Sequence, residues 1–313
     1  MSEPVVASIV LNDQTRTDLA SYGFRSWMLQ EIDQPYEVIV NLFNDREAVF
    51  EDLAKGKNPL CRVIIKKYAP PAVFNISAAN NIGLHFATGT YVMFANADII
   101  HPSGFLRAVA GEMSRRNLHY VVGTRSNLTP ERTAALAPAQ SFTREKNFDI
   151  LRGVEFLKEI PRGYGLSPWI LSREAARAVG AFDSNVFCHE DEDLNDRAMH
   201  YLRRSGKQQI LYCLFDTLGY HMHHKTSELQ AMGPASMNII RPRRLRLMAD
   251  PASTEDTVPT PLDSLDELLK ILHSSKKPDV PVGKHLREIM PWPLRVALKR
   301  SKQAAQILIK GHF

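Results

Sequence analysis

The fold of this chain is indicated by the stretch GTYVMFANADII, residues 89–100. Its apolar residues 91–94 predict a buried strand, because β-branched and aromatic side chains favour strands. The strand leads to Asn96 and Asp98, which we expect at its carboxyl end with both side chains projecting the same way. Open α/β sheets bind ligands at that end. Oxygen ligands of this kind suit Mg²⁺ or Mn²⁺ carrying phosphates, although Asn-x-Asp also occurs in ordinary turns.

Strands and helices alternate around this stretch. Apolar runs predict strands at residues 5–11, 36–43, 62–65 and 91–94. Helical apolar spacing predicts helices at residues 17–29, 47–53, 77–86 and 105–113. Such alternation requires crossover connections, so we expect a doubly wound, mainly parallel sheet with helices on both faces.

A dense acidic cluster begins a later helix. Four consecutive acids, Glu190–Asp193, precede apolar residues that recur at helical spacing, namely Leu194, Ala198 and Leu202. Carboxylates are favoured in the first turn of a helix, where the free N–H groups and the helix dipole attract anions. A solvated, well-capped helix start is one interpretation of this segment. Because four acids exceed what capping needs, a functional cluster is the other.

The last predicted strand covers residues 209–215, and three histidines follow it. They are His221, His223 and His224, within the segment Leu218–Lys225. Imidazole nitrogens are common ligands of divalent ions, so this segment is a candidate part of a metal site. A surface turn or an adventitious zinc site would produce the same pattern.

Four motifs occur in an order and spacing that resemble a known protein family. They are Ala79–Gly83, Ala87–Tyr91, Asn96–Asp98, and Gly180–Asp183 leading to Glu190–Leu194 with Arg197. Together they look like the landmarks of family 2 glycosyltransferases with the GT-A fold, and the resemblance covers residues 5–225. It implies an α/β fold of the GT-A type, a doubly wound and mainly parallel sheet with helices on both faces.

The resemblance also implies an activity. Such enzymes move a hexosyl group from a nucleotide-diphosphate donor to an acceptor hydroxyl with inversion. Asp98 and His221 would hold Mn²⁺ or Mg²⁺, which neutralises the leaving diphosphate. Asp191 matches the family's general base, and the acids around it raise its proton affinity. Glu190 would lie beside the acceptor, and His224 would contact either the metal or a phosphate.

The donor site matches the family only in part. Arg16 is retained after the first strand, whereas Asn12 and Asn80 stand where the family usually has other residues. Asn44 follows the second strand, where an aspartate-containing turn usually reads the base, so UDP is expected only as the commonest nucleotide. Asn96 replaces the first aspartate of the metal motif and removes one negative charge. We expect all five side chains to contact the donor.

Two aromatic residues are candidates for the acceptor site. Tyr164 and Trp169 lie in and after a loop that contains Gly163 and Gly165, and such loops commonly shape binding sites. Stacking on a sugar face of a saccharide or lipid-linked acceptor is one interpretation of both side chains. A core tryptophan on a strand at residues 168–171 is the other.

A change of composition near residue 241 divides the chain into three predicted parts. They are a catalytic domain at residues 1–240, a basic and proline-rich linker at 241–262 and a helical extension at 263–313. Ser264 and Glu267 form a capping box at the start of the extension's first helix. A second, basic amphipathic helix at residues 294–308 suits an anionic membrane surface. Packing against the catalytic domain or a second subunit is the alternative.

Composition narrows the class of protein. The 313 residues carry a net charge of +5 and three cysteines, whose scattered positions fit neither a disulfide framework nor a zinc site. We find no signal peptide and no run of about 18 apolar residues. A cytoplasmic protein is therefore expected, peripheral on the inner face of a membrane at most. A nucleic-acid partner is not expected, because no groove-reading motif accompanies the basic tail.

Cell-surface polysaccharide or glycolipid synthesis is the role expected of such a family member. A catalytically silent nucleotide-sugar-binding protein of the same fold would explain Asn96 and the altered base pocket. The retained Asp98, Asp191 and His221 favour an active enzyme instead. A nucleotidyltransferase is the nearest rival enzyme, but the glycine-rich phosphate loop that it needs after the first strand is missing.

Overall fold

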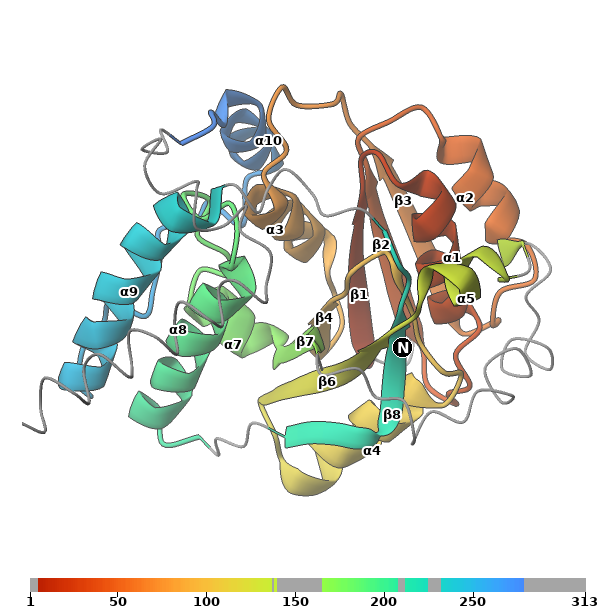
Figure 1. The fold of residues 1–313 in the computed structure, drawn as a ribbon. Coiled ribbons are helices and arrows are strands. Elements are labelled where there is room, and N and C mark those ends of the chain that lie inside the picture. The colour runs from red at the N-terminus through yellow and green to blue at the C-terminus, as the bar shows by residue number, and fades with distance from the viewer. Residues whose placement is uncertain (1–4, 137, 140–164, 208–211, 225–231, 279–313) are drawn as a thin grey trace, which may run out of the picture.

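An eight-stranded sheet forms the centre of the molecule, in the strand order β3-β2-β1-β4-β7-β6-β8-β5. The computed structural model describes residues 5–136, 138–139, 165–207, 212–224 and 232–278. The strands are β1 (Ala7–Asp13), β2 (Tyr36–Leu42), β3 (Cys61–Lys67), β4 (Tyr91–Phe94), β5 (Ile99–Ile100), β6 (Tyr120–Asn127), β7 (Gly165–Ser172) and β8 (Tyr212–His221). Figure 1 shows the sheet between two groups of helices.

Strand pairing is mainly parallel, as the sequence predicts. β1 pairs with β2 and β4, β2 with β3, and β6 with β8, all in parallel. The antiparallel pairs are β4 with β7, β6 with β7, and β5 with β8. The expected fold class is therefore confirmed. The carboxyl ends of β2, β1 and β4 lie side by side at one edge of the sheet.

Helices cover both faces of the sheet. They are α1 (Thr17–Met28), α2 (Glu47–Leu53), α3 (Ile76–Phe86), α4 (Phe105–Arg116), α5 (Pro130–Ala134), α7 (Arg173–Ala178), α8 (Glu190–Arg204), α9 (Gly233–Ala249) and α10 (Leu265–Ser274). Ile9 of β1 packs in a buried cluster with Phe24 of α1. Its neighbour Val10 packs in a second cluster with Leu84 of α3. Two apolar layers, one on each face, therefore stabilise the sheet.

The structure corrects the first part of the predicted linker at residues 241–262. Residues 241–249 belong to α9, which continues through Pro242 to Ala249. Arg243 and Arg244 of this helix form ion pairs with acids of α8. These acids lie about 50 residues earlier in the chain, so local composition does not reveal the contact. The rest of the predicted linker, residues 250–262, has no helix or strand.

The first helix of the predicted extension is α10. Ser264 caps it, because the Ser264 hydroxyl accepts a hydrogen bond from the Glu267 N–H at 3.3 Å. Leu268 and Leu272 of α10 are buried in one apolar cluster with Ile82 of α3. This part of the chain therefore packs on the sheet domain.

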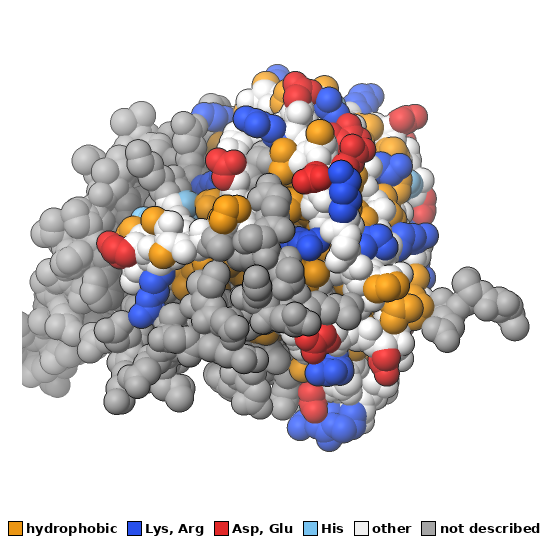
Figure 2. Space-filling view, turned by 90° about the vertical axis from the view of Figure 1, so that its right-hand side faces the viewer, with side chains coloured by type: hydrophobic (Ala, Val, Ile, Leu, Met, Phe, Trp, Pro, Cys, Tyr) orange, Lys and Arg blue, Asp and Glu red, His pale blue; other side chains and the backbone are white. Residues whose placement is uncertain are grey.

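The described residues bear only in part on the predicted membrane contact. Among the helices that the structure describes, none combines the length and the apolar character that a membrane span requires. Figure 2 shows basic and acidic side chains interspersed on one face of the molecule. The predicted basic helix at residues 294–308 lies outside the described residues.

Candidate active site

Asp98 and two histidines meet where β5 pairs with β8. Asp98 lies in the turn between β4 and β5, and His221 ends β8. Ile99 of β5 pairs with His221, and the Met222 N–H donates to the Asp98 carbonyl at 3.0 Å. This antiparallel pairing brings together two segments that are far apart in the sequence.

The cluster contains three metal-ligating side chains. Asp98 Oδ2 lies 2.8 Å from His224 Nε2 and 3.6 Å from His221 Nε2. The two Nε2 atoms are 3.2 Å apart, and ligand atoms of the three residues lie within 4.8 Å of one another. Asn127 Oδ1, 3.0 Å from His221 Nδ1, orients the His221 ring. One carboxylate oxygen and two imidazole nitrogens form a donor set that suits a divalent ion.

The Asp98 carboxylate is ionised and has one oxygen to spare. Burial raises its pKa, but hydrogen bonds to His221 and His224 outweigh burial and hold the pKa well below its usual range. Asp98 Oδ1 is buried and has no hydrogen-bond partner among the described residues, although buried polar atoms normally have one. A cation between this carboxylate and the imidazoles fits the missing partner.

Arg16 lies next to the same cluster. Its Nη1 atom is 3.3 Å from Asp98 Oδ2 and 3.0 Å from His224 Nε2. Arg16 is the N-cap residue of α1, and its backbone N–H donates to Asp13 Oδ1 at 3.2 Å. A guanidinium beside candidate metal ligands is well placed to bind phosphate oxygens.

An amide network joins the carboxyl ends of β1 and β2. Asn12 Nδ2 donates to Asn80 Oδ1 at 2.6 Å, and Asn41 Nδ2 donates to Asn12 Oδ1 at 2.9 Å. Nearby, Asn44 Nδ2 donates to Asp13 Oδ2 at 2.8 Å. The sequence prediction named Asn12, Asn44 and Asn80 but missed Asn41 and Asp13. A polar residue near the carboxyl end of each of two adjacent parallel strands is the sequence pattern that could have identified Asn41 and Asp13.

The first two acids of α8 have raised proton affinities. Glu190 and Asp191 are half-buried. Burial and the charge of Asp191 raise the pKa of Glu190 to about 8. Burial also raises the pKa of Asp191, against the opposing effect of the hydrogen bond that Asp191 Oδ1 accepts from the Glu192 N–H at 2.9 Å. Like charges therefore contribute to these shifts, but burial is the main cause.

The next two acids of α8 are held by arginines. Asp193 Oδ2 lies 2.7 Å from Arg197 Nε, and both side chains are almost completely buried. Asp193 Oδ1 lies 2.5 Å from Arg243 Nη1, and Glu192 Oε2 lies 3.0 Å from Arg244 Nη2. This half of the acidic cluster therefore has a structural role in ion pairs, which differs from the solvated, well-capped helix start that the sequence also allowed.

Arg125 of β6 responds to charges in both parts of the candidate site. Burial lowers the pKa of its guanidinium, and the charges of Asp98 and Asp191 raise that pKa. One side chain therefore lies within electrostatic reach of both carboxylates, although the two come from distant segments. The sequence prediction did not include Arg125.

Comparison with known proteins supports the resemblance to family 2 glycosyltransferases. Residues 44–173, less than half of the chain, match the family model described as glycosyl transferase family 2. A comparison with curated protein sequences gives no match.

Solved glycosyltransferase structures share the fold of this chain. TarS residues 1–349 from S. aureus align with a TM-score of 0.55 and 13% identity, over 86% of this chain and 69% of that chain. In complex with UDP, the same protein aligns with a TM-score of 0.53 and 12% identity, over 91% and 71%. In complex with UDP-GlcNAc, the values are 0.51 and 13%, over 72% and 61%. At these identities, the likeness shows the fold alone.

The remaining predicted site residues, Asn96, Trp169 and Tyr164, lie in different surroundings. Asn96 is exposed, whereas only 14% of the Asp98 side chain is exposed. Because β4 ends at Phe94, the strand alternation on which a shared direction was predicted does not extend to these two residues. Trp169 is 7% exposed and stacks on Tyr120 at 6.3 Å. Trp169 therefore packs in the core, which favours the core interpretation over an acceptor contact, and Tyr164 lies outside the described residues.

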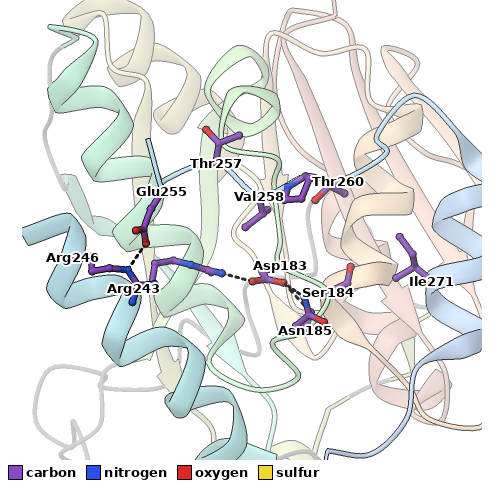
Figure 3. A pocket seen from close by; sticks show the side chains of 11 residues that line it. Asp183, Ser184, Asn185, Arg243, Arg246, Glu255, Thr257, Val258, Thr260 and Ile271 are labelled. Carbon is purple, nitrogen blue, oxygen red and sulfur yellow. Dashed lines mark hydrogen bonds and ion pairs between the residues drawn. The ribbon is translucent and has the colours of Figure 1, made fainter. Parts of the chain in front are cut away.

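A separate cavity of about 460 Å³ lies between α9, α10 and the turn after α7 (Figure 3). Two ion pairs line it, Arg243 with Asp183 at 2.5 Å and Arg246 with Glu255. None of its lining residues belongs to the Asp98 cluster. Because its arginines are paired with acids, we do not count this cavity as part of the candidate active site.

Proposed function

We propose that this chain is a metal-dependent, inverting glycosyltransferase that moves a hexosyl group from a nucleotide-diphosphate donor, UDP first, to an acceptor hydroxyl. The observation that carries the proposal is the convergence of Asp98, His221 and His224 within 4.8 Å. Asp191 supports it, because its charge and that of Asp98 act on the same guanidinium. Inverting transfer needs these two elements, a cationic site for the leaving group and a base for the acceptor.

The donor binds at the Asp98 end of the site. Asp98, His221 and His224 hold Mn²⁺ or Mg²⁺, which when bound supplies positive charge for the leaving diphosphate. Arg16 donates N–H groups to phosphate oxygens from its position 3.0 Å from His224 Nε2. The amide network around Asn12 offers donors and acceptors to the nucleoside.

Asp191 is the general base of the proposed reaction. A bond forms from the acceptor oxygen to the anomeric carbon while the bond from that carbon to the diphosphate oxygen breaks. The hydroxyl proton moves to the Asp191 carboxylate, whose raised pKa favours proton acceptance near neutral pH. Glu190, with a pKa of about 8, keeps its proton at neutral pH. It can then donate a hydrogen bond to the acceptor while Asp191 stays ionised.

Metal binding provides the first test. Isothermal titration calorimetry measures the affinity for Mn²⁺ of the wild type and of His221→Ala, His224→Ala and His223→Ala. We expect each ligand variant to lose about tenfold or more in affinity. His223→Ala is the matched control, because this histidine lies between the two ligands in the sequence and its side chain is exposed, whereas its backbone N–H donates to the Thr133 hydroxyl. Equal losses in all three variants would contradict the proposed metal site.

Turnover provides the second test, which separates an enzyme from a silent binding protein. UDP release from UDP-GlcNAc is measured with and without Mn²⁺, followed by a panel of other nucleotide sugars. We expect release that requires the ion, because the leaving diphosphate carries negative charge. Metal-independent release would overturn the proposed metal dependence. Tight binding of every donor without release would favour the silent protein.

The cellular role is the most specific part of the proposal. We place the enzyme in the cytoplasm, with residues 284–313 on the inner face of an anionic membrane, in cell-surface polysaccharide or glycolipid synthesis. Support comes from the seven Lys and Arg residues against one acid in this segment. It forms part of a helical extension at residues 263–313, which follows the catalytic domain and a short linker. Co-sedimentation with phosphatidylglycerol vesicles tests it, and binding that survives removal of residues 284–313 would contradict it.

A further inference from the structure

Arg125 lies on the same face of the sheet as part of the Asp98 cluster. In the strand register, Arg125 of β6 pairs with Gly219 of β8, and Asn127 pairs with His221. Alternate residues of a strand share a face, so Arg125 lies on the face that carries Asn127 and His221. The contact between Asn127 Oδ1 and His221 Nδ1 at 3.0 Å agrees with that shared face.

Glycines flank Arg125 on both neighbouring strands. Its register partners are Gly165 of β7 and Gly219 of β8. A Cβ atom at Gly219 would approach Ile99 Cγ2 to 2.9 Å and His101 Nε2 to 3.3 Å, so this position has little room for a side chain. Of the three paired positions Gly165, Arg125 and Gly219, Arg125 alone therefore carries a side chain beyond a hydrogen atom.

Two nitrogen atoms of Arg125 have no hydrogen-bond partner among the residues that the structure describes. Nε and Nη1 are buried and form no hydrogen bond with the described residues. A buried donor on a charged group is costly to leave unpaired, so native proteins rarely keep one without a function. Asp98 Oδ1, which belongs to the same site, is buried without a partner as well. Unsatisfied donors and an unsatisfied acceptor mark a place where a ligand supplies the partners.

We infer that Arg125 binds oxygen atoms of the sugar that is transferred, an inference that rests on the proposed function. In that reaction the diphosphate lies at the Asp98 end and the acceptor hydroxyl at the Asp191 end. The sugar ring lies between them, and Arg125 lies within electrostatic reach of both carboxylates. The Arg125 Nε and Nη1 N–H groups donate to sugar oxygens and hold the anomeric carbon between leaving group and base.

The test compares a nucleotide with the corresponding nucleotide sugar. Calorimetry with Mn²⁺ measures the affinities of wild type, Arg125→Lys and Arg125→Gln for UDP and UDP-GlcNAc. We expect the affinity for UDP-GlcNAc to fall about tenfold or more, because hydrogen bonds to a charged donor are lost. The affinity for UDP, which lacks the sugar, should change less than about twofold. GDP and GDP-mannose form a second pair for the same comparison.

Arg25 of α1 supplies a matched control. It is a buried arginine whose Nη1 atom donates to the Leu53 and Lys55 carbonyls at 2.7 and 2.9 Å. Arg25→Lys should leave the ratio of the two affinities unchanged. If Arg125→Gln does not fold, the comparison is made with Arg125→Lys.

The outcomes separate the inference from the proposed function. Equal losses for UDP and UDP-GlcNAc in Arg125→Lys would assign Arg125 to the diphosphate and overturn the inference, as would unchanged binding of both. A wild-type protein that binds none of the nucleotides or nucleotide sugars would overturn the proposed function itself. A loss confined to the nucleotide sugars supports both.

Discussion

The two halves of the acidic turn that begins α8 differ in what surrounds their charges. Glu192 and Asp193 face arginines of α8 and α9. Glu190 and Asp191 instead have raised pKa values, chiefly because of their partial burial. All four acids lie in one helical turn and share its dipole. The difference between them therefore comes from tertiary partners, and those partners separate structural carboxylates from the candidate catalytic pair.

The largest expected effect concerns the catalytic half. Asp191→Asn should lower the rate of sugar transfer about 10²- to 10⁴-fold, because the acceptor proton loses its base. Donor affinity should stay within about twofold, because the base acts on the acceptor. Steady-state transfer and calorimetry measure the two quantities. Glu192→Gln, at the next position, is the matched control and should retain most activity, and full activity of Asp191→Asn would remove the distinction between the halves.

The next effect concerns the buried half. Asp193→Asn should lower the free energy of unfolding by about 3–5 kcal/mol, because it leaves the Arg197 guanidinium buried without its charge partner. Urea unfolding at neutral pH measures this loss. Asp52→Asn is the control, because Asp52 forms an exposed ion pair with Lys55 and should not measurably affect stability. A loss no larger than that of the control would show that Asp193 has no structural role.

A smaller, pH-dependent effect sharpens the contrast. Glu190 keeps its proton in the folded state up to a pKa of about 8, whereas its ordinary pKa is 4.5. The folded wild type therefore binds more protons than the unfolded chain, and its stability falls as the pH rises from 4.5 to 8. Glu190→Gln lacks this loss, so its Tm advantage over the wild type should grow across that range. A pH-independent difference between the two melting curves would contradict the raised pKa.

The smallest effect is expected at the exposed edge of the structural half. Arg244 pairs with Glu192 and Asp196, and its side chain is 36% exposed. Solvent screens such pairs, so Arg244→Gln should cost less than about 1 kcal/mol. A double-mutant cycle with Asp196→Asn measures the coupling directly. A coupling energy above about 2 kcal/mol would mean that exposed and buried pairs hold α8 equally.

Local sequence patterns predict most of the fold but not the docking of its last helices. β4 at residues 91–94 and α2 at residues 47–53 have the bounds that apolar periodicity predicts. The continuation of α9 beyond residue 240 was missed. Arg243 pairs with Asp183 and Asp193, which lie 60 and 50 positions away. No local pattern carries that information.

The candidate site was predictable where family motifs mark it and not where strand register decides it. Asp98 and His221 belong to recognisable motifs, and the structure brings them together, although their roles stay predictions. Asn41 and Arg125 lie within strands, and a polar residue there has no visible function until the paired strands are known. For Trp169 the sequence leaves two interpretations open, because a tryptophan beside glycines is typical of both binding loops and cores.

The arginines of α9 also determine where the chain can be truncated without loss of stability. A shortened chain of residues 1–240 would keep the residues proposed for catalysis but lose Arg243. Asp183 and Asp193 would then remain as nearly buried anions without that counter-charge, directly beside the segment that carries the candidate base. A domain boundary placed at residue 240 from the sequence motifs would therefore give an unstable fragment. Expression or grafting of this domain should extend past α10.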